Sequence, residues 1–121
     1  MRVLVSFEEE SHVFMEAMAD AIRVLRPNVE VATANADELE TAVKRLDPHL
    51  VICSPSLLHN PVDNRLACIE LSPELDRSSR FRIGERRWES TNPTLGKILR
   101  VVDETNILSG MHRQQNLTDQ V

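Results

Sequence analysis

The sequence predicts an α/β fold, with one domain built on a mainly parallel sheet of four or five strands. Three observations support this prediction. The chain has 121 residues, of which 41% are hydrophobic, so it is long enough for one domain with its own core. Apolar strand-like runs alternate with helical patterns through its first half. Two strand–helix units followed by a third strand imply parallel pairing through right-handed crossovers, with helices on both faces of the sheet.

The first strand and helix have the clearest patterns. Residues 2–7 (RVLVSF) are apolar and β-branched, which predicts a strand buried on both faces. Over residues 13–25, apolar side chains recur at helical spacing and form one face of a helix. Ser11 stands where an N-cap is expected, and the preceding run of three glutamates suits the positive end of the helix dipole. The Pro-Asn pair after residue 26 ends this helix.

A second strand–helix unit and a third strand follow. Residues 29–34 alternate between apolar and polar side chains and predict a second strand. Asn35 and Glu38 have the spacing of a capping box, and residues 39–46 place apolar side chains on one helical face. Residues 50–53 (LVIC) predict a third, fully apolar strand.

The pattern weakens after residue 54. Residues 54–64 are broken by two prolines and do not suit a long helix. We expect a fourth short strand at residues 68–71 and a fifth at residues 81–83, which could extend to Trp88. Asn92 as N-cap and Pro93 at the first helical position predict the start of a last helix. We assign residues 1–110 to the domain and expect a flexible C-terminal tail over residues 111–121.

Composition excludes several classes of function. The net charge of −5 disfavours nucleic-acid binding, and an aromatic fraction of 3% provides no stacking platform for single strands. No apolar run approaches the length of a membrane span, and the first residues lack a signal-peptide pattern, so we expect a cytoplasmic protein without a membrane partner. The three glycines do not form a phosphate-binding loop, and the histidines lack metal-ligand spacing. We expect no cofactor.

Two features could be structural or functional. Cys53 and Cys68 lie in apolar runs without a metal-binding companion, so we interpret both as core residues. Basic residues and the only tryptophan gather near residues 77–88, at Arg77, Arg80, Arg82, Arg86, Arg87 and Trp88. This group could form a protein interface or an anion site, because Trp and Arg are frequent at interface hot spots. We favour a solvated loop and strand edge for the arginines, and leave Trp88 open between core and interface.

Polar residues follow the predicted strands, where α/β sheets bind their ligands. The set comprises Glu8, Glu9, Ser54, Ser56, Ser72 and Asn92. With the strand order, these positions resemble a flavodoxin-like sheet and, within that class, the response-regulator receiver family. The run PHLVICS is similar to the receiver strand that ends in the phospho-accepting Asp, and Ser54 stands in its place. Phe7 and Glu8 stand where receivers have two metal-binding acids, Ser72 matches a Ser or Thr, and Asn92 replaces the Lys of a Lys-Pro pair.

This resemblance implies a three-layer receiver-like fold without the receiver's chemistry. Ser54 cannot form an acyl phosphate, Phe7 removes a metal ligand, and Asn92 removes the cation that stabilises the phosphoryl oxygens. Residues 55–66 and 73–92 leave the third and fourth helices reduced. We therefore expect a non-catalytic signalling or protein-interaction module, whose partner is another protein or a second copy covering exposed sheet.

The alternative is a small-molecule or anion-binding domain, or an enzyme, with its site at the strand ends. Glu8 would be its one candidate metal ligand, although helix-end acids are ordinarily structural. The sequence leaves the choice open, and we favour the module without enzymatic activity.

Overall fold

The computed structural model of the chain describes residues 1–55, 66–72, 74 and 76–119, with side chains up to Gly110. Within these residues, six strands and three α-helices follow one another. Their bounds are β1 (Arg2–Phe7), α1 (His12–Leu25), β2 (Glu30–Asn35), α2 (Leu39–Leu46), β3 (Leu50–Cys53), β4 (Ala67–Glu70), β5 (Ser78–Ile83), β6 (Arg86–Thr91) and α3 (Leu95–Asp119). Short 3₁₀ turns precede α1 and α2.

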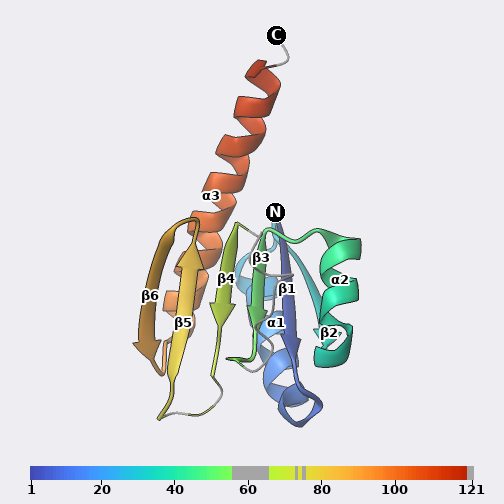
Figure 1. Cartoon of the computed structure of the whole chain (residues 1–121), viewed down its shortest axis with the longest axis vertical. Helices are drawn as coiled ribbons and strands as arrows, with labels where there is room; N and C mark the ends of the chain where they lie inside the picture. Colours follow the sequence, from blue (N-terminus) through green and yellow to red (C-terminus); the bar gives the residue numbers. More distant parts are fainter. Residues whose placement is uncertain (56–65, 73, 75, 120–121) are drawn as a thin grey trace.

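All six strands form one sheet in the order β2-β1-β3-β4-β5-β6. The first four are parallel, whereas β5 is antiparallel to both of its neighbours. β6 therefore runs in the same direction as β4, with β5 between them (Figure 1). The carboxyl ends of β1, β3, β4 and β6 consequently lie at one edge of the sheet.

The two faces of the sheet are covered unequally. On one face, α1 and α3 pack against fully buried strand residues such as Val5, Ile52 and Ile69; we call it the α1/α3 face. On the other, α2 packs against Leu4 and Val51; we call it the α2 face. Burying each such aliphatic side chain stabilises the fold by roughly 1.5–3 kcal/mol. Within the described residues, no helix covers the α2 face of β5 and β6 (Figure 1).

The α/β class, the mainly parallel sheet and the helices on both faces are confirmed, but the predicted number of strands is wrong. The strand expected at residues 81–83 belongs to β5, but its extension to Trp88 is wrong, because the chain turns after Ile83 and returns as β6. Gly84, with φ +59°, begins the two-residue loop between these strands. Glycine is preferred there because a positive φ is costly for other residues. Among the described residues between 73 and 92 no helix forms, as expected.

The predicted helix caps are corrected by the structure. Ser11 is at the N-cap of α1 and Asn35 at the N-cap of a 3₁₀ turn, but neither side chain makes a capping hydrogen bond. Asn92 adopts φ +49° and is not the cap of α3. Thr94 takes that role, because the backbone N–H of Lys97 donates to its Oγ1 at 3.3 Å.

The last helix, α3, extends past one edge of the sheet (Figure 1). α3 continues past Gly110 to Asp119 and projects beyond the edge where β1 and β4 begin (Figure 1). The flexibility expected for residues 111–121 stays a prediction. The segment of residues 54–64, expected to lack a long helix, falls mostly in residues 56–65, outside the described ones. None of the described helices combines the length and apolar character of a membrane span.

Candidate functional site

A cavity of about 580 Å³ lies at the carboxyl ends of β1, β3 and β4, where β5 begins. These parallel strands end at the same edge, so the residues that follow them come together. The described residues that line it are Glu8, Glu10, Ser11, Ser54, Pro55, Glu70, Ser72, Glu74, Arg77, Ser78 and Arg80. We call this the strand-end pocket.

The structure brings together half of the predicted pocket residues. Glu8, Ser54 and Ser72 line the strand-end pocket, as the strand order suggested. Glu9 is exposed on the 3₁₀ turn and does not line it. Asn92 follows β6, two strands or about 10 Å away from β4, because β5 intervenes. Ser56 lies outside the described residues.

Hydrogen bonds fix the wall formed by the segment after β4. The backbone N–H of Ser72 donates to Ser79 Oγ at 3.0 Å, and the N–H of Glu74 donates to Ser72 Oγ at 3.2 Å. The Arg77 guanidinium lies 2.8 Å from the Glu74 carboxylate. Ser54 is 6% exposed, and its backbone N–H donates to Ser6 O at 3.3 Å. The wall is therefore held by its own contacts before any ligand arrives.

The electrostatics of the strand-end pocket do not favour an anion. Its carboxylates, from Glu8, Glu10, Glu70 and Glu74, outnumber its two guanidinium groups. A hydrogen bond with Glu8 and repulsion from its charge raise the pKa of Glu10. Burial raises the pKa of Glu70. Within the described residues, no three His, Cys, Asp or Glu side chains are placed to hold a metal ion.

Several of the positions that the resemblance matches to phosphoryl-transfer residues of receivers hold side chains of other types in this chain. Phe7 is fully buried on the α1/α3 face, where its ring meets that of Phe14 edge-on at 5.3 Å. Ser54, directly after β3, carries a hydroxyl rather than a carboxylate. Asn92 lies two strands away from β4, so the positions that the resemblance matches to receiver residues do not come together in the pocket.

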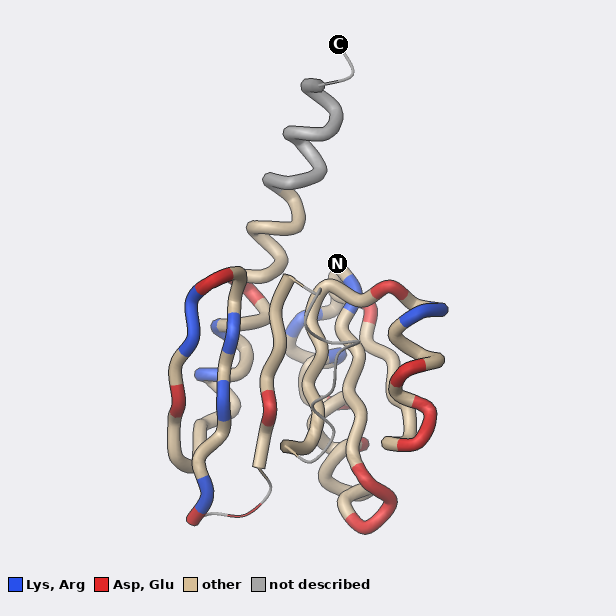
Figure 2. The backbone as a smooth tube through the Cα atoms, viewed as in Figure 1, with Lys and Arg blue, Asp and Glu red and all other residues tan. Residues whose placement is uncertain are grey.

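The arginine group is divided between several places rather than forming one patch. Arg77 lines the strand-end pocket, whereas Arg86 lies on the α1/α3 face, paired with Glu104 and 5.3 Å from the Trp88 ring. Arg80, Arg82 and Arg87 lie on the α2 face. The hairpin is nonetheless the main basic region. It lies at the other side of the molecule from the acidic residues of α2 and of the turn after β1 (Figure 2).

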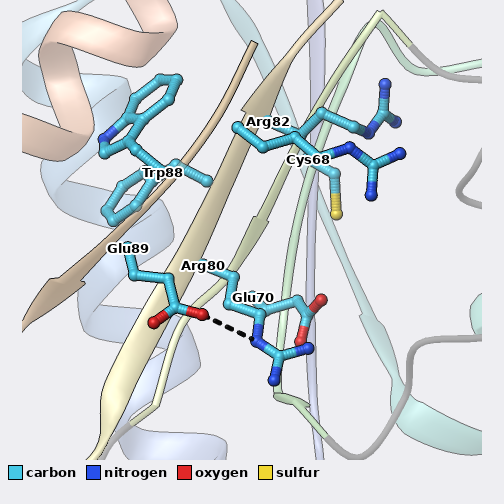
Figure 3. Close-up of a pocket in the computed structure, with 8 residues that line it drawn as sticks. Cys68, Glu70, Arg80, Arg82, Trp88 and Glu89 are labelled. Atoms are coloured by element: carbon cyan, nitrogen blue, oxygen red, sulfur yellow. Dashed lines mark ion pairs between the residues drawn. The ribbon is translucent and has the colours of Figure 1, made fainter. Parts of the chain in front are cut away.

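A second cavity, of about 400 Å³, lies on the α2 face of β4, β5 and β6 (Figure 3). Opposing residues form two rows across these strands. One row is Glu70, Arg80 and Glu89; the other is Cys68, Arg82 and Arg87. Arg80 and Glu89 pair at 3.6 Å, whereas Arg82 and Arg87 place like charges opposite each other. We call these residues the charged rows.

Both cysteines are buried and free, as expected of core residues. Cys53 and Cys68 belong to the cluster under α2. A hydrogen bond with the Cys68 thiol and burial raise the pKa of Cys53 well above its usual value. A raised pKa keeps this thiol protonated and unreactive.

Trp88 is both a packing residue and a surface residue. Its ring stacks on Phe81 at 5.3 Å with planes 7° apart, while 37% of the residue remains exposed. It lies in β6, the outermost strand of the sheet. The two interpretations left open by the sequence therefore both describe part of this side chain.

Several pocket residues escaped the sequence reasoning. The sequence indicates Glu10 and Ser11 as helix-end residues, and Glu70 as the interior of a strand. Glu70 could have been found, because a charged side chain in an otherwise apolar strand is uncommon. Glu74 and Ser78 carried no signal, since their position depends on the path of the loop.

Comparison of the chain with models of protein families, with curated proteins and with solved structures gave no match. Any conclusion about the function of this chain therefore rests on its own geometry.

Proposed function

We propose that this chain is a receiver-like, flavodoxin-related module that acts by contact with another protein and catalyses no phosphoryl transfer. The observation that carries the proposal is the identity of the residue after β3. Ser54 stands there, almost fully buried, where the receiver mechanism needs a carboxylate nucleophile. The parallel order β2-β1-β3-β4 supports the resemblance, and the inserted β5 separates this chain from the usual receiver arrangement.

Exposed apolar side chains support a contact function. Trp88 on β6 and Leu108 on α3 are each 37% exposed, and Ile107 is 62% exposed. The helix that carries Ile107 and Leu108 projects past the sheet (Figure 1). Large exposed apolar side chains on neighbouring elements are typical of protein-binding surfaces.

The test combines phosphoryl donors with ligand binding. The purified chain is incubated with Mg²⁺ and acetyl phosphate, and its intact mass is measured; we expect no gain of a phosphoryl group. Thermal unfolding is then measured with Mg²⁺ and beryllofluoride, nucleotides, FMN and phosphate, and we expect no rise in Tm, because nothing binds selectively to the folded state. A phosphorylated product, or a Tm raised by several degrees, would contradict the proposal.

The second candidate function is binding of a small polar ligand in the strand-end pocket. The pocket's volume and its mixture of carboxylates, hydroxyls and guanidinium groups favour it. Its excess of acids indicates a neutral or cationic polar ligand rather than an anion. A Tm rise that is lost in Ser72→Ala but kept in Ser90→Ala, a half-buried serine that does not line the strand-end pocket, would support this function over the contact module.

A further inference from the structure

β6 (Arg86–Thr91) is an edge strand, paired with β5 on one side and open on the other within the described residues (Figure 1). An open edge offers backbone N–H and C=O groups to another strand. We propose that β6 pairs antiparallel with β6 of a second copy, about a two-fold axis at Trp88, and joins two sheets into one. This inference rests on the proposed function, because it names the partner and surface of the contact module.

The charges of β6 select the register. A two-fold axis perpendicular to a sheet places residues of the same face opposite each other, so it passes through a residue position. Three axis positions leave most of the strand paired. An axis at Arg87 places that residue opposite its own copy, and an axis at Glu89 does the same with a carboxylate. Only the axis at Trp88 places Arg87 of each copy opposite Glu89 of the other, twice.

The charged rows of each copy leave room for this pairing. Arg87 forms no ion pair with another described residue and lies opposite Arg82, a like-charge pair that costs stability. Glu89 is exposed and engages Arg80 only at 3.6 Å (Figure 3). In the dimer, Glu89 of the second copy lies beside Arg87 and offsets the repulsion. The charges that would prevent other strands from pairing at this edge thus permit one symmetric partner.

Trp88 provides the apolar centre of the same interface. It is the only tryptophan of the chain, it lies on the α1/α3 face, and 37% of it is exposed. At the axis, the two indole rings come side by side and extend the stack that each forms with Phe81. Central aromatic residues next to arginines contribute most of the binding energy in many interfaces. The interface therefore combines backbone pairing, two ion pairs and one aromatic contact.

Sedimentation velocity of the full chain tests the proposal through charge reversal. We expect a reversible dimer for the wild type. Arg87→Glu and Glu89→Arg each place like charges opposite each other twice, so the dissociation constant of each should rise at least tenfold. An equimolar mixture of the two variants restores both opposite pairs, and a heterodimer should form that neither variant forms as a homodimer.

The stability of the variants separates a lost interface from a lost fold. Arg87→Glu places a carboxylate opposite Arg82, so this variant should unfold at the same or a higher temperature while it dimerises less. Glu89→Arg loses its contact with Arg80 and can fold less well. Trp88→Cys therefore provides an independent test. Residues opposite each other across the axis have Cα atoms about 4.5–5.5 Å apart, within disulfide range, so diamide should cross-link this variant as a dimer.

Cysteines beside the axis serve as controls for register. Arg86→Cys or Ser90→Cys alone should not cross-link, whereas a mixture of the two should. A monomeric wild type at millimolar concentration, open-ended assemblies, a dimer unaffected by Arg87→Glu, or no cross-link in the mixture of Arg86→Cys and Ser90→Cys would each overturn the proposed interface. These results concern dimerisation and not phosphorylation or ligand binding. The proposed function is therefore contradicted only by its own test, and the two failures can be told apart.

Discussion

The four parallel strands and the β5–β6 hairpin belong to one sheet but differ in how far their side chains are buried. β1 and β3 lie between helices on both faces, and nearly all their side chains are buried. The hairpin has α3 on one face and charged rows on the other, and most of β6 is exposed. The parallel strands hold the fold together, whereas the hairpin presents surface. We therefore expect substitutions in the hairpin to affect binding to a partner, and substitutions in the parallel strands to affect stability.

Removing the same atoms from each region should give the largest contrast. Ile52 is fully buried in central β3, and Ile83 of β5 is 4% exposed beside an open cavity of about 500 Å³. We expect Ile52→Ala to lower the free energy of unfolding by about 4 kcal/mol and Ile83→Ala by about 2 kcal/mol, because the second site can relax toward the cavity. Urea denaturation measures both, and equal losses would contradict the contrast.

The loop of the hairpin should be the next most sensitive position. Gly84 has a positive φ and open space around it, so Gly84→Ala should cost about 1–2 kcal/mol through backbone strain alone. Gly110 is the matched control, since it lies in α3 with no atom near its missing Cβ. Gly110→Ala should stabilise the chain by up to about 1 kcal/mol. Thermal unfolding that gave both substitutions the same sign would refute this prediction.

Substitution of two buried serines, one in each region, should change the free energy of unfolding by a smaller amount. The hydroxyl of Ser6 in β1 has no hydrogen-bond partner among the described residues, whereas Ser79 in β5 accepts the Ser72 N–H. We expect Ser6→Ala to raise the free energy of unfolding by about 1 kcal/mol, and Ser79→Ala to lower it by a similar amount. Chemical denaturation in parallel decides the point. A destabilised Ser6→Ala would show that its hydroxyl is satisfied after all.

The smallest effect should come from the ion pair that joins α1 to α3. The Arg26 guanidinium lies 2.6 Å and 2.9 Å from the two carboxylate oxygens of Asp103, and this contact lowers the pKa of Asp103. Because the unfolded carboxyl binds its proton more readily, the pair stabilises the fold above the unfolded pKa of about 3.9. That contribution is lost as the pH falls through the lowered folded pKa.

Asp103→Asn should therefore reduce Tm at pH 7 by a few degrees at most, since solvent screens exposed pairs. The Tm values of wild type and variant should converge at acidic pH. The raised pKa values of Glu10 and Glu70 act in the opposite direction, but they are common to both proteins and cancel in the difference. A difference in Tm that stays constant with pH would contradict the role of this pair.

The sequence predicted the parallel half of the fold well because its signals are local and repeated. The apolar run of β3 and the helical face of α2 leave few alternatives, and both were located to the residue. The hairpin was misjudged because its strands carry arginines, which obscure the alternation of Phe81 and Ile83 with polar residues. Gly84 followed by Glu85 was the available signal for a tight hairpin loop.

The candidate site was only partly predictable, for a geometrical reason. Glu8, Ser54 and Ser72 follow neighbouring parallel strands, so strand order alone brings them together. The resemblance places Asn92 at the same strand ends, as the match to the Lys of a Lys-Pro pair after the fifth strand, but the insertion of β5 moves it away. Which strand follows β4 in space depends on long-range pairing, and no local pattern near Asn92 reports it.

The connection of the strands also has a consequence for how the chain reaches its fold. β5 and β6 are joined by two residues, and an isolated hairpin of this kind closes in about 1–10 μs. β1, which lies between β2 and β3, must instead find partners far along the chain: contacts join Arg2 to Glu30 and to His49, 28 and 47 residues away. Such pairings are slow, because the loop-closure entropy is lost before the contacts form. We therefore expect the rate of folding to be set by β1, with the hairpin edge formed while β1 is still unpaired.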